Sequence, residues 1–228
     1  MKTLSNIEKF NVIRPVLDKH DYDKYCFPII KRINEDDIDF NSLIPINLNN
    51  VSVNKSNTNK LILMFTYDMY LDKLWTDPLK YLSRFKGCAL ITTPDFSIYD
   101  GMNENIIKFN IYRNRWLGCL YQDYGLIVAP TISWGNKDTY DICFSGVEPN
   151  GIYVISTLGC KTHKKEFFDG YNEMMKRLKP KLVIVYGDLI EGMYGRILNY
   201  KFSDSFNHKG DNIPLYDISK IAEIKEVK

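Results

Sequence analysis

The clearest prediction of the fold comes from residues 151–187, GIYVISTLGCKTHKKEFFDGYNEMMKRLKPKLVIVYG. In this stretch two apolar runs flank a helical pattern. The runs at 151–159 and 181–187 have the length of β-strands, and the second is bounded by proline and glycine. Between them, apolar residues recur at spacings of three and four, which predicts an amphipathic helix over about 164–178. These residues are Phe167, Phe168, Tyr171, Met174, Met175 and Leu178. This order predicts a βαβ unit in which 181–186 is an interior parallel strand.

The same alternation of strand and helix patterns extends upstream to residue 61. The predicted strands are 61–67, 88–94, 126–134 and 140–146, and the predicted helices are 77–85 and 105–122. Alternating strands and helices predict an α/β fold, here a three-layer domain with a mostly parallel sheet and crossover helices.

Residues 1–60 differ from the rest because asparagine and serine cluster in the segment NLNNVSVNKSNTNK at 47–60. Such a polar tract predicts a loop or linker. We therefore expect residues 1–60 to form an N-terminal extension that docks on a single α/β domain at 61–228. The chain from Asp188 onward is glycine-rich and polar, and we expect it to be a C-terminal tail of that domain.

The 228-residue chain has the composition of a globular protein, with 45% hydrophobic and 25% charged residues. This composition excludes disordered, collagenous and coiled-coil chains. The net charge of +2 is too small to indicate a nucleic-acid or membrane surface. The five cysteines are scattered without a C-x-x-C pair, and no segment reads as a signal peptide or a membrane span. We therefore expect a cytoplasmic protein with reduced thiols.

Seven short motifs occur in order between residues 94 and 187. They are PDFS (94–97), IYRNRWLG (111–118), QDYG (122–125), APTISWG (129–135), CFSGVEPNG (143–151), STLG (156–159) and LKPKLVIVYG (178–187). In this order they resemble the family called domain of unknown function 4417, over about residues 60–190. Members of that family occur in bacterial genomes, phages, plasmids and conjugative elements. The resemblance implies a phage or mobile-element protein and carries no catalytic residues with it.

Small or polar residues and one tryptophan follow the predicted strands. They are Asp95, Ser97, Ser133, Trp134, Ser145, Ser156, Thr157, Gly187 and Asp188. In an open α/β sheet, ligands bind at the carboxyl ends of the parallel strands, so these residues are candidates for one crevice. The alternative interpretation is that they end strands and cap the helices that follow.

Asp95 and Asp188 are the acidic candidates at these strand ends. An acid that follows a buried strand can bind a metal, a ribose hydroxyl or a proton. The two carboxylates together would suit a hydrolytic pair or a magnesium ion. The alternative is that Asp95 caps the loop at 96–105.

The basic candidates lie in two segments. The sequence STLGCKTHKKEF at 156–167 places His163 and Lys164 ahead of a predicted helix, where exposed N–H groups attract phosphate. The segment lacks the spacing of a P-loop, and lysines that are simply solvated are the alternative. Arg113 lies beside aromatic residues in the helix at 105–122 and is a candidate for a phosphate or base contact.

Two functions from different classes follow from these patterns. The first is the binding of a nucleotide or nucleic acid at the carboxyl edge of the sheet. Its candidate catalytic residues are Asp95 and Asp188, and its candidate ligand-binding residues are Ser97, Arg113, Ser133, Trp134, Ser156, Thr157, His163 and Lys164. The second is a non-enzymatic protein that binds a host protein, for host takeover or anti-defence. The polar strand ends favour the first function, and the absence of any recognisable catalytic constellation in the sequence favours the second.

Overall fold

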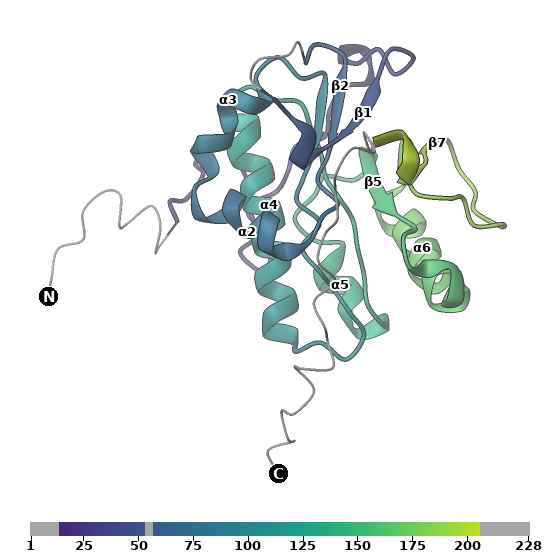
Figure 1. Ribbon diagram of the computed structural model, residues 1–228. Helices are drawn as coiled ribbons and strands as arrows, with labels where there is room; N and C mark the ends of the chain where they lie inside the picture. The colour runs from purple at the N-terminus through teal and green to yellow at the C-terminus, as the bar shows by residue number, and fades with distance from the viewer. Residues whose placement is uncertain (1–13, 53–56, 206–228) are drawn as a thin grey trace, which may run out of the picture.

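The computed structural model describes residues 14–52 and 57–205. Its strands are β1 (Ile44–Asn47), β2 (Lys60–Leu63), β3 (Leu90–Thr92), β4 (Val128–Ala129), β5 (Ile152–Ser156), β6 (Leu182–Tyr186) and β7 (Ile197–Tyr200). Its α-helices are α2 (Asp68–Thr76), α3 (Leu82–Phe85), α4 (Glu104–Asp123), α5 (Tyr140–Cys143) and α6 (Lys164–Leu178). Short 3₁₀ helices are η1 (Glu35–Asp37), η2 (Leu48–Asn50), η3 (Pro78–Tyr81), η4 (Lys137–Thr139), η5 (Cys160–Thr162) and η6 (Phe202–Ser205). Figure 1 shows how these elements are arranged.

The strands follow one another across the sheet in the order in which they occur in the sequence. Strands β1 to β4 form one parallel ladder and β5 to β7 form another. A parallel bridge between Thr131 and Val154 joins the two ladders. There the Ile132 N–H donates to the carbonyl of Val154 at 2.8 Å, and the Val154 N–H donates to the carbonyl of Pro130 at 3.0 Å. The predicted α/β class with a mostly parallel sheet and crossover helices is confirmed.

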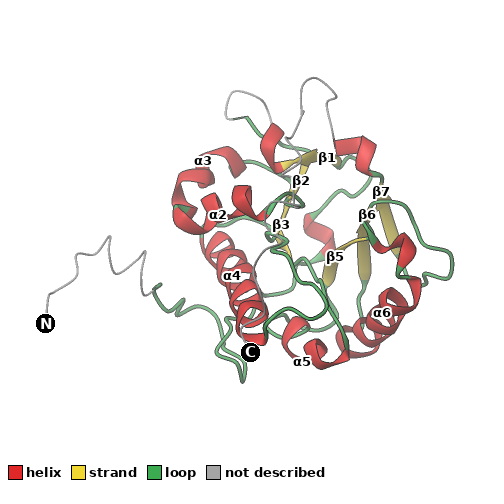
Figure 2. Ribbon diagram, turned by 60° about the horizontal axis from the view of Figure 1, so that its bottom comes forward, coloured by secondary structure: helices red, strands yellow, loops and turns green. Residues whose placement is uncertain are grey.

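The sheet is curled into an open barrel. The ring of Phe65, just after β2, stacks on that of Tyr186 in β6 at 5.1 Å between centroids. In a flat sheet these strands would lie four spacings of about 4.8 Å apart, so the contact requires strong curvature. The segment η6 lies against β1, and Arg196 forms an ion pair with Glu35, so the gap between the first and last strands is bridged. Figure 2 shows the strands as an arc with helices α2 to α6 outside it.

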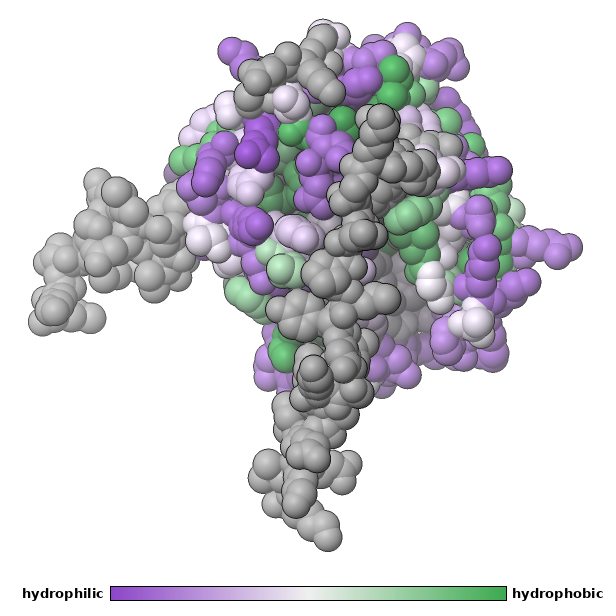
Figure 3. Space-filling view, in the orientation of Figure 1, coloured by the Kyte–Doolittle hydropathy of each residue, from purple (hydrophilic) through white to green (hydrophobic). Residues whose placement is uncertain are grey.

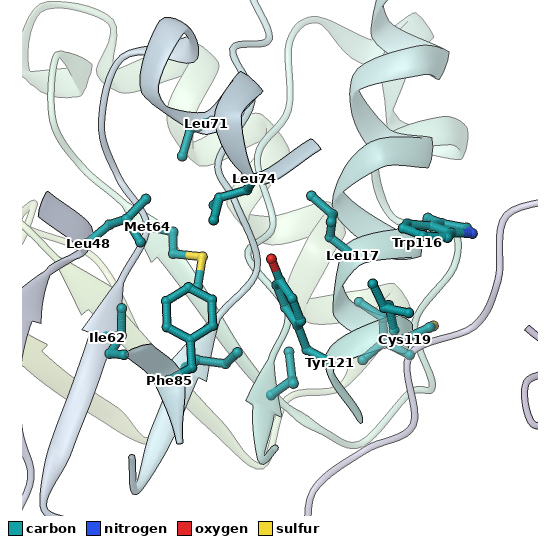
Figure 4. Close-up of a cluster of buried hydrophobic side chains, with 14 of the residues drawn as sticks. Leu48, Ile62, Met64, Leu71, Leu74, Phe85, Trp116, Leu117, Cys119 and Tyr121 are labelled. Carbon is teal, nitrogen blue, oxygen red and sulfur yellow. The ribbon is translucent and has the colours of Figure 1, made fainter. Parts of the chain in front are cut away.

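Three apolar clusters hold this arrangement together. The concave side of the sheet encloses one, to which nearly every strand contributes: Leu61, Leu63, Leu90, Ala129, Ile152, Val154, Leu182, Ile184 and Tyr186. On the convex side, α2, α3 and α4 pack on β2 to β4, where Figure 4 shows Met64, Phe85 and Tyr121 side by side. Farther along, α5 and α6 pack on β5 and β6. Right-handed crossovers between sequential parallel strands place these helices on one face, so the layers wrap around a common interior.

The βαβ unit predicted over 151–187 is confirmed. Helix α6 spans Lys164–Leu178, with Tyr171 and Met174 fully buried and Lys176 exposed. Strand β6 is buried along its whole length and lies between β5 and β7. The apolar stripe and the continuous apolar run therefore gave the correct elements at the correct positions.

One predicted strand is longer than the structure shows, and another is wrong. The strand at 61–67 is neither first nor so long, because β1 precedes it and β2 ends at Leu63. β1 contains Pro45, which interrupts a strand pattern and is tolerated because β1 lies at the edge of the sheet. The predicted strand at 140–146 is instead α5, which follows η4. Tyr140 and Cys143 are buried three residues apart, which is a helical and not a strand spacing.

The remaining elements differ in extent. The helix predicted over 77–85 is η3 followed by α3, with Pro78 at the first helical position, and the preceding helix α2 was missed. Strand β4 is much shorter than the predicted 126–134, and the tail after Asp188 contains the unpredicted β7. Residues before β1 also join the core, because Leu17 and Ile30 belong to the cluster under α4. No helix in residues 14–52 and 57–205 has the length and hydropathy needed to cross a bilayer.

Candidate functional site at the carboxyl edge of the sheet

Asp95 lies at the carboxyl end of β3, where backbone contacts fix its position. Its N–H donates to the carbonyl of Met64 at 3.1 Å, and Asn114 Nδ2 of α4 donates to the carbonyl of Pro94 at 2.8 Å. The residue as a whole is half-buried, but its Oδ1 is fully buried and has no hydrogen-bond partner among the described residues. An unsatisfied buried carboxylate oxygen is unfavourable unless a ligand, a water or a proton compensates it.

The surroundings of Asp95 disfavour its charge. Burial raises the pKa of Asp95 to about 7, and the nearby charge of Asp68 raises it further, whereas the side chain of Ser133 beside the carboxyl group lowers it. A carboxyl group with this pKa exchanges its proton near neutral pH, which is the property of a general acid or base. Asp95 can therefore accept a hydrogen bond from a ligand or transfer a proton to one.

Asp68 is an acidic neighbour of Asp95 that was not predicted from the sequence. It is the first residue of α2, where a negative charge is favourable. Its Oδ1 accepts hydrogen bonds from the N–H of Ser97 at 3.1 Å and from Oγ of Ser97 at 3.0 Å. The signal was available, because Asp68 directly follows the predicted strand 61–67 and so occupies a strand end like Asp95.

Arg113 supports the loop after β3 from the side of α4. Its Nη1 pairs with Asp72 Oδ1 at 2.6 Å, and its Nη2 donates to Asn110 Oδ1 at 2.7 Å. Asn110 Nδ2 in turn donates to the carbonyl of Ser97 at 2.7 Å. The guanidinium lies 3.7 Å from the ring centre of Phe96. Arg113 is thus engaged by protein groups and holds the segment that carries Asp95 and Ser97.

The ends of β5 and β6 have a different character. Asp188 is exposed and pairs with Lys161 Nζ at 2.7 Å, and this ammonium lowers the pKa of Asp188. The Thr157 Oγ1 donates to the carbonyl of Asp188 at 2.7 Å, and Ser156 Oγ accepts from the N–H of Leu158 at 3.1 Å. Ser156 and Thr157 therefore serve local backbone contacts in this structure.

His163 and Lys164 lie at the start of α6, where both are exposed. The preceding turn passes through Gly159, whose φ of +77° is in the left-handed region that favours glycine. The Cys160 thiol follows this turn, and its pKa is raised by burial and by the charge of Asp95. The charge of Asp95 therefore reaches the turn between β5 and α6.

Trp134 faces α6 and contributes to packing. A Cβ added at Gly170 of α6 would lie 2.1 Å from Trp134 Nε1, so the indole ring rests on the helix backbone. The ring also lies 6.1 Å from that of Phe144 and 5.6 Å from that of Phe167. These contacts hold the indole ring against α6 and its aromatic neighbours.

The structure brings part of the predicted set together. Asp95, Ser97 and Ser133 lie close to one another, joined by the unpredicted Asp68, whereas Asp188 pairs with Lys161 and Arg113 pairs with Asp72. In residues 14–52 and 57–205, no three His, Cys, Asp or Glu side chains are grouped as metal ligands. The acidic part of the site is therefore a buried carboxyl group with a second carboxyl group and two serine hydroxyl groups near it.

The fold is an open parallel α/β barrel with a polar site at the carboxyl ends of its strands, the edge at which such barrels bind their ligands. The chain belongs to the family described as a domain of unknown function, DUF4417, whose family model matches residues 22–201. This confirms the resemblance seen in the seven sequence motifs.

The chain is similar to phage proteins along part of its length. It is 34% identical over 128 residues to the Gene 1 protein of Mycobacterium phage L5, which covers 55% of this chain and 56% of that protein. It is also 34% identical over 128 residues to the Gene 1 protein of Mycobacterium phage D29, covering 55% of this chain and 47% of that protein. The chain spans about half the length of these curated relatives. No solved structure matches it.

Proposed function

We propose that this domain binds a nucleotide, free or within a nucleic acid, at the carboxyl edge of its barrel. The observation that carries the proposal is the buried Oδ1 of Asp95, which has no partner within the described residues. A ligand that donates a hydrogen bond to this oxygen would compensate its burial. Ribose hydroxyl groups and the amino groups of bases are such donors.

The distribution of charge along the edge supports a ligand with an anionic end. The acidic residues Asp68 and Asp95 follow β2 and β3, whereas Lys161 and His163 lie between β5 and α6 and Lys164 is the first residue of α6. Cys160 begins η5, beside Lys161 in the sequence, and the charge of Asp95 acts on its thiol. The polar part of a nucleoside would lie over Asp95, and its phosphate would lie at the start of α6, where helix N–H groups and lysines favour anions.

Isothermal titration calorimetry tests the proposal with AMP, GMP, CMP, UMP and a short single-stranded oligonucleotide. The wild-type chain is expected to bind at least one of them, and Asp95→Asn is expected to weaken that binding about tenfold, as for a lost charge-assisted hydrogen bond. Runs with and without Mg²⁺ separate a direct contact with Asp95 from an ion bridge. Asp138→Asn, which changes an exposed acid on η4, is the matched control and should leave the affinity unchanged.

Two results would refute the proposal. One is that none of these probes binds the wild-type chain, with or without Mg²⁺. The other is that Asp95→Asn binds with wild-type affinity while its circular dichroism spectrum remains native.

A further inference from the structure

Several large apolar side chains remain exposed around the carboxyl edge of the barrel. Each follows a different strand: Tyr67 after β2, Tyr99 after β3, Leu158 after β5 and Leu189 after β6. On the part of the surface that Figure 3 shows uncovered, hydrophobic residues lie in small groups between hydrophilic ones. Tyr99 is the most exposed aromatic residue of the described chain, at 64%.

The backbone around Tyr99 is fixed although its side chain is exposed. The carbonyl of Tyr99 accepts a hydrogen bond from the N–H of Met102 at 3.3 Å. The same carbonyl lies 3.4 Å from where a Cβ would stand on Gly135, and Asp100 Oδ1 accepts from Asn136 Nδ2 at 2.8 Å. These contacts bind the loop after β3 to the loop after β4, so Tyr99 occupies a defined place on the rim.

The hydroxyl group of Tyr99 connects it to the acidic part of the site. It donates to Oγ of Ser97 at 3.3 Å, and that hydroxyl in turn donates to Asp68 Oδ1 at 3.0 Å. Asp68 is close enough to Asp95 for its charge to act on that carboxyl group. One end of the Tyr99 side chain is therefore held by the network around Asp95, while the faces of its ring are open to a ligand.

We infer that Tyr99 is the stacking surface for the ligand, which therefore carries a flat heteroaromatic base whose polar edge reaches Asp95. The inference rests on the proposed nucleotide-binding function and identifies which part of the nucleotide this side of the edge recognises. A base on Tyr99 removes an exposed ring from water, and stacking of bases on aromatic side chains tolerates any base. Because the loop after β3 and the hydroxyl group of Tyr99 are already held by hydrogen bonds, little conformational freedom is lost when the base binds.

Binding of AMP, GMP, CMP and UMP is compared with binding of ribose 5-phosphate, which lacks the base. Tyr99→Leu keeps an apolar side chain without a ring and should weaken binding of the nucleotides about tenfold, with ribose 5-phosphate unaffected. Tyr99→Phe keeps the ring, loses only the contact with Ser97, and should weaken nucleotide binding by less than about threefold. Tyr124→Leu is the matched control, because Tyr124 is 56% exposed but caps α4 at the opposite edge of the barrel.

The outcomes separate this inference from the function on which it rests. Suppose that nucleotides bind the wild-type chain and that Asp95→Asn weakens this binding while Tyr99→Leu does not. Stacking on Tyr99 is then wrong, and the proposed nucleotide site at Asp95 is retained. Ribose 5-phosphate binding as tightly as the nucleotides would also overturn the stacking role. If no nucleotide binds the wild-type chain, the proposed function itself fails. The thermal midpoint of each variant shows whether it has kept its fold.

Discussion

Asp95 and Asp188 occupy equivalent places in the sequence, since each directly follows a buried parallel strand, yet their environments are opposite. Asp95 has a buried oxygen without a described partner and a raised pKa. The side chain of Asp188 is 55% exposed, pairs with Lys161 and has a lowered pKa. The comparison shows that a strand-end acid becomes a candidate functional group through burial and neighbouring charge. Position alone does not make it one.

The largest effect on the free energy of unfolding is expected from Arg113→Ala, which removes contacts that hold the loop carrying Asp95. Arg113 is 9% exposed, pairs with Asp72, binds Asn110 and stacks on Phe96. Its loss leaves Asn110 without this donor and opens space beside Phe96, so we expect about 3 kcal/mol of destabilisation. Urea unfolding followed by circular dichroism measures it. A loss below about 1 kcal/mol would show that the loop after β3 does not depend on Arg113.

Asp95→Asn should change how stability depends on pH. The folded-state pKa of Asp95 is raised from 3.8 to about 7, so between these values the native chain binds more protons than the unfolded chain. Stability contributed by the neutral carboxyl group is therefore lost as the pH rises through 7. At 1.36 kcal/mol per pKa unit over the two units from pH 5 to the folded pKa, we expect wild type to lose about 3 kcal/mol relative to Asp95→Asn between pH 5 and pH 8.

The same urea experiment at pH 5, 6, 7 and 8 measures this difference, with Asp188→Asn as the control. Because the pKa of Asp188 is lowered from 3.8, this carboxyl group is ionised in both the folded and the unfolded chain between pH 5 and pH 8, so Asp188→Asn should leave the pH dependence of stability as in wild type. Parallel stability curves for wild type and Asp95→Asn would contradict the burial of the Asp95 charge.

Gly170→Ala tests the packing of the Trp134 ring against helix α6. An added methyl group would collide with the indole ring, so we expect about 1 to 2 kcal/mol of destabilisation. In a helix without such a contact, the same change from glycine to alanine stabilises. Asn172→Ala on the exposed face of α6 is the control and should be neutral or slightly stabilising. A Gly170→Ala variant more stable than wild type would show that Trp134 does not pack against α6, which would leave its ring available to a ligand.

The smallest effect is expected from Lys161→Ala on the Asp188 side. The ion pair is exposed to solvent at both partners, and such pairs contribute little to stability. We expect the melting temperature to change by less than about 2 °C. A decrease in melting temperature several times larger would show that Asp188 is also part of a stabilising network, and the contrast between Asp188 and Asp95 would be lost.

The sequence predicted the elements whose patterns are long and uninterrupted. Helix α6 and strand β6 were placed correctly because a complete apolar stripe and a continuous apolar run specify them. Strand β4 has two residues and β1 contains a proline, so neither carries a strand pattern of normal length. Helix α5 is a single turn whose aromatic and β-branched residues favour a strand locally, and tertiary burial decides otherwise.

The candidate site was predictable only in part. Asp95 follows from its place after an apolar run. Its relation to Asp68 does not, because the hydrogen bonds from Ser97 to Asp68 join residues 29 apart in the sequence. The engagement of Arg113 by Asp72 likewise joins residues 41 apart. Contacts of this range depend on how α2 and α4 pack on the curled sheet, and no local pattern encodes them.

A nuclear magnetic resonance titration of the ¹³C-labelled aspartate carboxyl groups, with and without saturating nucleotide, tests the central claim directly. In the free chain, Asp95 should titrate near pH 7 and Asp188 below its ordinary value. Bound nucleotide should lower the Asp95 midpoint, because a donated hydrogen bond stabilises the ionised carboxylate. A midpoint for Asp95 near 3.8 that nucleotide leaves unchanged would contradict both the environment described for this residue and its role in binding.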